Sequence, residues 1–350
     1  MTPTSVLRPD ATGSGQQRAP KPRVRINIAR FWDGATADEI IATVLPDLLP
    51  YVDFEVSDAP RVLLYGPYTG PMPAGDFVKV FIGCENVAPI MSECDWAFGV
   101  ANEASFPHPR YMRIERWGDD RHLLQPEKSW PDVLRAKTRF CAFIYSNESP
   151  YREAFYRALS AYKPIDSPGR RLNNMPSIDP VPGEPSWGAK IAFLCQYKFV
   201  IAFEHSAQPG YHTEKLTHAI EADCLPIYWG DPEIGRSFNV ARFVDARDHL
   251  PGTPRLFPRL PYRPHSLRSP LRPTVAQRVA RRINGTLNRV EQGVWAMRGF
   301  DALVRRVIAI DRDDDLYLRH LREPFLIRNE LPDRSRWIAR WREIFANAAA

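Results

Sequence analysis

The sequence has few cysteines and no long apolar run, and both absences narrow the class of protein. Its 350 residues include five cysteines, an odd number without a C-x-x-C pair, so neither a zinc site nor a disulfide framework is predicted. No stretch of about 18 apolar residues occurs, and residues 1–21 are polar and lack the apolar core of a signal peptide. We therefore expect a cytoplasmic protein that does not span a membrane, with residues 1–21 as a disordered tail.

The charge balance points to an acidic partner. The formal net charge is +6, and the basic residues concentrate late in the chain. Such a balance suits a nucleotide diphosphate or an anionic membrane surface. Only the charge would support a nucleic-acid partner, because no zinc-finger spacing or RNA-recognition signature is present. We therefore expect no nucleic-acid partner.

Apolar runs of strand length alternate with helical patterns along most of the chain. Strand-like segments lie at 22–30, 61–65, 77–82, 95–100, 139–147, 199–203 and 225–228, and helical patterns lie at 37–49, 151–162 and 188–196. This alternation predicts an α/β protein with parallel sheets covered on both faces. The length suits two domains, 22–138 and 139–325, with a basic, proline-rich insertion at about 250–300.

The segment 198–230 carries the clearest chemical signal. A buried strand is followed by a loop with Pro209 and Gly210, by Thr213 as the N-cap of a helix, and by the next strand. Ligands of open parallel sheets bind outside the carboxyl ends of the strands, where a helix N-terminus favours an anion. A lysine in the first helical turn, such as Lys215, is unfavourable next to the positive end of the helix dipole, and a bound diphosphate would explain its presence. An equally simple interpretation is that Lys215 is a solvated surface side chain and that Glu214 is a surface carboxylate stabilised by the dipole.

At this point the sequence resembles the glycosyltransferase family 10 fucosyltransferases. The residues that carry the resemblance are Phe203-Glu204, then Pro209-Gly210-Tyr211-x-Thr213-Glu214-Lys215, then Leu225-Pro226-Ile227-Tyr228-Trp229-Gly230-Asp231-Pro232. Upstream, Ser146-Asn147, Tyr151-Arg152-Glu153, Glu85-Asn86-x-x-Pro89 and Asp95-Trp96-Ala97-Phe98-Gly99 are similar to further family elements. The resemblance covers about 60–245 and, weakly, 310–345.

The resemblance implies a GT-B architecture, in which two Rossmann-like domains face a central cleft. The first domain would bind the acceptor, the second GDP-fucose, and the segment 326–350 would end in a helix packing back on the first domain. The activity implied is inverting transfer of L-fucose to the 3- or 4-hydroxyl of a GlcNAc-type sugar in an oligosaccharide, lipopolysaccharide or polysaccharide. No metal is needed for the chemistry, so a divalent cation would be at most stimulatory.

The resemblance also assigns roles to individual residues. Glu85 would be the general base, and Arg152 and Lys215 would neutralise the diphosphate. Further donor-binding residues would be Tyr211, Glu214, Ser146, Asn147, Glu204, His205 and Thr213. The family has Asn where this chain has His205, which leaves open a different NDP-sugar donor. A second alternative is a catalytically inactive nucleotide- or carbohydrate-binding protein.

Three features of the C-terminal third have two interpretations each. Arginines alternate with prolines over 255–282. This segment is either a solvated insertion or a surface that docks on the inner, anionic face of a membrane. The Asp-rich run 311–315 contains the D-x-D pattern of metal-dependent transferases, but helix capping is the simpler interpretation. The amphipathic helix expected at 333–347 could enter a membrane, although packing on the first domain is favoured.

Overall fold

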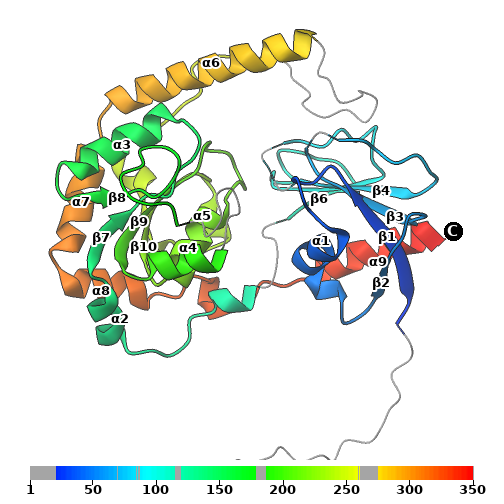
Figure 1. Cartoon of the computed structure of the whole chain (residues 1–350), viewed down its shortest axis with the longest axis horizontal. Helices are drawn as coiled ribbons and strands as arrows, with labels where there is room; N and C mark the ends of the chain where they lie inside the picture. Colours follow the sequence, from blue (N-terminus) through cyan, green and yellow to red (C-terminus); the bar gives the residue numbers. More distant parts are fainter. Residues whose placement is uncertain are drawn as a thin grey trace, which may run out of the picture.

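The computed structural model describes residues 21–68, 70–83, 85, 87–114, 120–178, 187–258, 260 and 275–349, and these form two α/β domains (Figure 1). The strands of the first domain are β1 (Arg23–Ala29), β2 (Asp53–Val56), β3 (Val62–Tyr65), β4 (Val78–Ile82), β5 (Trp96–Gly99) and β6 (Tyr111–Arg113). They form one parallel sheet in the order β2-β1-β3-β4-β5-β6. The predicted α/β class is confirmed.

The two faces of the first sheet are covered differently. One face packs against α1 (Ala37–Val44) and against α9 (Ser335–Ala349), the last helix of the chain. The other face is covered, among the described residues, by loops that contribute Met72, Met91 and Phe106. Both faces of this sheet are therefore covered, one by helices and the other by loops. The helix expected over 37–49 ends early because Leu45 precedes Pro46, which disfavours helical backbone at Leu45, and a 3-10 turn follows at Pro46–Leu48.

The second sheet is parallel in the order β11-β10-β9-β7-β8. Its strands are β7 (Arg139–Ala142), β8 (Ile165–Asp166), β9 (Tyr197–Phe203), β10 (Leu225–Trp229) and β11 (Val244–Asp245). The neighbouring helices are α2 (Trp130–Ala136), α3 (Pro150–Ser160), α4 (Trp187–Leu194), α5 (Glu214–Glu221), α6 (Val275–Met297), α7 (Asp301–Asp311) and α8 (Asp314–Arg322). Helices α3, α7 and α8 bury one face of the sheet, and α4 and α5 bury the other.

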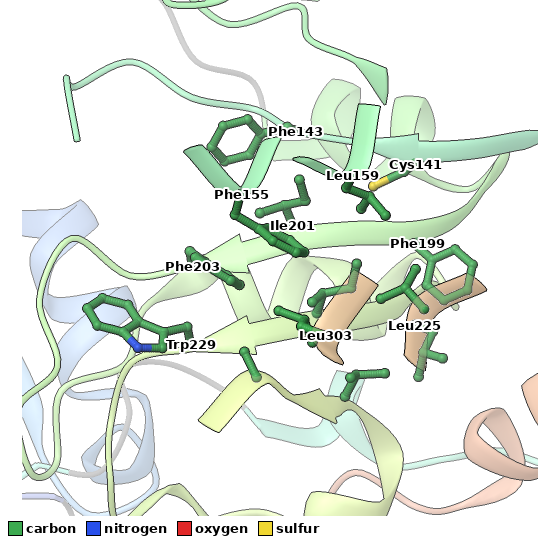
Figure 2. Close-up of a cluster of buried hydrophobic side chains, with 14 of the residues drawn as sticks. Cys141, Phe143, Phe155, Leu159, Phe199, Ile201, Phe203, Leu225, Trp229 and Leu303 are labelled. Atoms are coloured by element: carbon green, nitrogen blue, oxygen red, sulfur yellow. The ribbon is translucent and has the colours of Figure 1, made fainter. Parts of the chain in front are cut away.

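Aromatic residues dominate the larger core of the second domain, shown in Figure 2. Phe155 of α3 stacks on Phe203 at the end of β9, with ring centroids 4.8 Å apart, and Tyr151 of the same helix contacts Trp229 of β10. These contacts fix the N-terminal turn of α3 over the carboxyl ends of β9 and β10. The next residue, Arg152, is thereby held at the same sheet edge.

Helix α9 returns the end of the chain to the first domain, as Figure 1 shows at the right-hand side. Trp341 stacks on Phe98 of β5 at a centroid distance of 5.1 Å, and Trp337 meets the same ring edge-on. Both indoles are buried, so the apolar face expected for 333–347 is occupied by protein. No helix in the described part of the chain is long and apolar enough to cross a bilayer.

The proline-rich stretch at 250–300 is not loop throughout. Residues 275–297 form α6, a 23-residue helix that the sequence interpretation missed because arginines and prolines around it masked its apolar spacing. The predicted arginines 259, 263, 268 and 272 lie outside the described residues. In the Asp-rich run, Asp313 accepts from the backbone N–H of Leu316 as the N-cap of α8, and Asp311 pairs with Lys163 and Lys198, so the capping interpretation is confirmed.

Candidate active site

A cavity of about 1000 Å³ lies between the two domains and brings most of the predicted site residues together. The first domain contributes Glu85 and Tyr68 to its wall. From the second domain come the predicted residues Asn147, Arg152, His205, Tyr211, Thr213, Glu214 and Lys215. Two predicted residues are not part of its wall: Ser146, which is exposed, and Glu204, which is fully buried.

Arg152 is the most unusual charge of this cavity. Only 4% of its surface is exposed, its Nε has no hydrogen-bond partner, and no carboxylate of the described residues forms an ion pair with it. Its other nitrogens donate weakly to the carbonyl oxygens of Phe203 (3.4 Å) and Asn147 (3.3 Å), and its guanidinium lies over the ring of Tyr145. Burial lowers the pKa of Arg152. A buried cation without a counter-ion at a cavity wall is a binding group for an anion.

Lys215 has two carboxylate partners in the folded chain. Its ammonium lies 3.2 Å from Glu204 and 3.8 Å from Glu214, and it donates to the hydroxyl of Thr213 at 2.9 Å. The position of Lys215 at the start of α5 therefore needs no ligand to explain it, which corrects the argument from the helix dipole. It still lines the cavity and remains one quarter exposed.

Glu204 organises the start of α5. Its carboxylate accepts from the backbone N–H of Thr213 at 2.7 Å and from the Thr213 hydroxyl at 2.8 Å. Thr213 is the N-cap of α5, as predicted, and accepts from the backbone N–H of Lys215. Glu204 is therefore a positioning residue for the cavity wall, because it lies one layer behind the surface that a ligand would touch.

Gly210 allows the loop before α5 to approach the first domain. It has a φ of +86°, and a Cβ there would lie 2.3 Å from the carbonyl oxygen of Val100 and 3.0 Å from Nε of Arg113. Only glycine meets both demands without strain. Arg113 also faces Asp231 at 4.0 Å across the domain boundary. The loop that carries Tyr211 is thus held in a fixed position between the domains.

Glu85 faces the cavity from the first domain. Burial raises the pKa of its carboxyl above the ordinary 4.5, while the hydrogen bond from the Tyr68 hydroxyl (3.4 Å) and the charge of Lys215 act in the opposite direction. A carboxylate with a raised pKa accepts a proton more readily at neutral pH than an exposed one. The geometry therefore allows Glu85 to act as a general base.

His205 is a neutral group at physiological pH. Burial, together with the charges of Lys215 and Arg152, lowers the pKa of its imidazole to about 4. The hydroxyl of Tyr211 lies 3.1 Å from its Nδ1. A neutral imidazole can donate and accept one hydrogen bond, as the amide expected at this position would, so the substitution preserves the polarity of the wall.

Some wall residues were not predicted. Ser149, the N-cap position of α3, has its backbone N–H bonded to the hydroxyl of Tyr145 and its own hydroxyl bonded to Gln292 of α6 at 2.8 Å. The Ser149-Pro150 pair at the start of α3 is a helix-start signal that could have identified Ser149. Nothing local marks Gln292, because only the folding of α6 onto α3 brings it to the cavity. No group of three or more metal-ligating side chains occurs among the described residues.

Comparison with known proteins finds a family similarity within the second domain. Residues 134–251 match the sequence model of glycosyltransferase family 10 (fucosyltransferase), C-terminal part. An alpha-(1,3)-fucosyltransferase of Helicobacter pylori is 36% identical over 113 residues, which cover 32% of this chain and 22% of that protein. A GDP-fucose protein O-fucosyltransferase 3 of Bos taurus is 36% identical over 118 residues, 33% of this chain and 24% of the relative. The aligned parts thus span about a quarter or less of these relatives.

The similarity of fold extends over nearly the whole chain. Crystal structures of an alpha1,3-fucosyltransferase with GDP-fucose and with GDP superpose with TM-scores of 0.61 and 0.63. They cover 95% of this chain and 93% and 94% of theirs, at 20% and 21% sequence identity. The predicted GT-B architecture is confirmed by these neighbours. Residues 134–251 of this chain are thus similar to the C-terminal part of the glycosyltransferase family 10 fucosyltransferases, and they lie within a two-domain GT-B fold.

Proposed function

We propose that this protein is an inverting glycosyltransferase that moves L-fucose from GDP-fucose to the 3- or 4-hydroxyl of a GlcNAc-type sugar in a glycan acceptor. The observation that carries the proposal is Arg152, a buried cation without a carboxylate partner, in one cavity with the start of α5 and with Glu85. The family match of the second domain and the names of its relatives support fucose as the sugar and GDP as the nucleotide.

The chemistry divides between the two sides of the cavity. The departing GDP carries negative charge, which Arg152, Lys215 and the positive end of the α5 dipole would stabilise. Glu85 would remove the proton of the acceptor hydroxyl as its oxygen attacks the anomeric carbon from the opposite face. Nothing in this division requires a metal ion, so transfer is expected to persist in EDTA and to increase at most modestly with a divalent cation.

A panel of nucleotides tests the donor. GDP at a hundred times its Kd is expected to raise the free energy of unfolding by about 2.7 kcal/mol, and UDP at the same concentration by much less. Thermal unfolding with GDP, UDP, ADP and CDP measures this. A preference for UDP would indicate that the donor is another NDP-sugar and not GDP-fucose. Binding of GDP without release of GDP from GDP-fucose, with or without acceptors, would instead support the catalytically inactive binding protein.

We also propose that the protein docks peripherally on an anionic membrane at the cytoplasmic face, through the outward side of α6. Five exposed apolar residues lie within an arc of about 80° of this helix; they are Val275, Val279, Ile283, Val290 and Met297. Arg278, Arg282 and Arg289 are exposed along one side of this stripe. An apolar stripe beside a row of cations suits the boundary between acyl chains and anionic headgroups, and each such arginine contributes about 1 kcal/mol near the surface.

Sedimentation with lipid vesicles tests this surface. The wild-type protein is expected to pellet with phosphatidylserine-containing vesicles, and the triple change of Arg278, Arg282 and Arg289 to Glu to remain in the supernatant. The matched control is the triple change of Arg305, Arg319 and Arg322, which lie on α7 and α8, to Glu; it should still bind. Equal binding by all three proteins, or binding of the wild type to neutral phosphatidylcholine vesicles alone, would contradict the proposal.

A further inference from the structure

A second cavity of about 480 Å³ adjoins the first on the side of α6. The two share four wall residues, which are Glu85, His205, Asn288 and Gln292. The remaining wall of the second cavity comes from Val87, from the loop Ser206-Ala207-Gln208, from Thr253 and Arg255, and from Glu291 and Trp295. Its volume lies within the range of small-molecule sites.

The wall formed by α6 is held by buried hydrogen bonds. Glu291 is 1% exposed and accepts from the backbone N–H groups of Leu256 and Phe257 at 2.8 and 2.9 Å. Trp295 donates from its indole to the carbonyl of Pro254, and Gln292 accepts from the hydroxyl of Ser149. One face of α6 thus fixes the segment 254–257 on one side and α3 on the other, so Thr253 and Arg255 stand on a rigid support.

The chemistry of the second cavity differs from that of the first. Besides Glu85, His205 and the buried Glu291 and Trp295, its polar groups are the amides of Gln208, Asn288 and Gln292, the hydroxyls of Ser206 and Thr253, and the exposed Arg255. It contains neither a helix N-terminus nor the buried Arg152. Amide and hydroxyl side chains that both donate and accept suit the hydroxyl groups of a sugar. Arg152 and Lys215, the proposed anchors for the diphosphate, line the first cavity and not the second.

Resting on the proposed transfer reaction, we infer that the second cavity is the subsite for the acceptor sugar, with Gln208, Thr253, Arg255 and Asn288 as its specificity-determining residues. Glu85 stands on the boundary of the two cavities, so its carboxylate reaches both the donor and the acceptor side. An attacking hydroxyl must approach the anomeric carbon opposite the leaving GDP, and the second cavity lies beside the base while the phosphate anchors line the first. Neutral His205 closes the same boundary without adding a charge.

The double variant Gln208→Ala/Arg255→Ala tests the subsite, because both residues line the second cavity alone. Loss of two contacts is expected to raise the KM for N-acetyllactosamine at least about tenfold, with kcat and the KM for GDP-fucose within about twofold of the wild type. Binding of N-acetyllactosamine to the GDP-saturated protein, followed by calorimetry, should weaken by the same factor. Arg305→Ala, an exposed arginine on α7, is the matched control and should change neither value.

The outcomes separate the subsite from the reaction. If the acceptor KM and the acceptor affinity are unchanged in the double variant, the second cavity is not the acceptor subsite. The same conclusion follows if the GDP-saturated wild-type protein binds neither N-acetyllactosamine nor GlcNAc. Acceptor-independent hydrolysis of GDP-fucose reports on the donor side alone. If the wild type binds the acceptor at this cavity but neither hydrolyses nor transfers GDP-fucose, the proposed function fails while the sugar site stands.

Discussion

Replacing Glu85 by glutamine is expected to lower kcat for fucose transfer by about 10²- to 10⁴-fold. Glutamine keeps the shape of the side chain and can still accept from the Tyr68 hydroxyl, but it cannot take a proton from the acceptor. The affinity for GDP should stay within about twofold of the wild type, since the anion-binding groups lie on the second domain. Steady-state kinetics and calorimetric titration with GDP measure the two effects.

The pH dependence of the wild-type enzyme provides a second measurement of the same group. Because burial raises the pKa of Glu85 above 4.5, kcat/KM is expected to fall as the pH decreases through that raised value, as the carboxylate becomes protonated. Glu93→Gln, a change of another carboxylate of the first domain outside both cavities, is the control and should keep the acid limb. An unaltered kcat in Glu85→Gln would show that another group accepts the proton.

Replacing Arg152 by methionine is expected to abolish nucleotide binding while leaving the fold intact. The guanidinium is buried without an ion-pair partner, and burial lowers its pKa, so its charge opposes folding in the absence of ligand. Methionine fills similar space, and only two long hydrogen bonds and the contact with Tyr145 are lost. The free energy of unfolding of the ligand-free protein should change by no more than about 2 kcal/mol.

The functional effect of this change should be large. Loss of a preorganised charge at the leaving group lowers kcat/KM by about 10²- to 10³-fold, and the stabilisation of about 2.7 kcal/mol by saturating GDP should disappear. Arg242→Met is a matched control, because Arg242 is equally buried in the second domain but bonds the carbonyl of Cys224 outside the site cavity. GDP must still stabilise this control variant. If GDP stabilises Arg152→Met as much as the wild type, Arg152 does not bind the nucleotide.

Local sequence patterns were sufficient for the elements that position the donor side. The spacing around Thr213 predicted the strand, the N-cap and the helix that the structure contains, because capping and period are properties of a few neighbouring residues. Local sequence patterns did not predict features that depend on contacts between segments far apart in the chain. Helix α6 was taken for an insertion, and the helix-dipole argument at Lys215 missed its ion pair with Glu204, eleven positions earlier.

By itself, the sequence determined that this chain forms parallel α/β domains and that its second domain resembles glycosyltransferase family 10, since both depend on short motifs with fixed spacing. Only the tertiary structure decided which of these residues meet. It placed Glu85 and Arg152 in the wall of one cavity, buried Glu204 behind that wall, and brought Asn288 and Gln292 of α6 to the boundary of two cavities. The reason is physical: contacts between distant segments follow from the packing of whole sheets and helices, which no single stretch of sequence encodes.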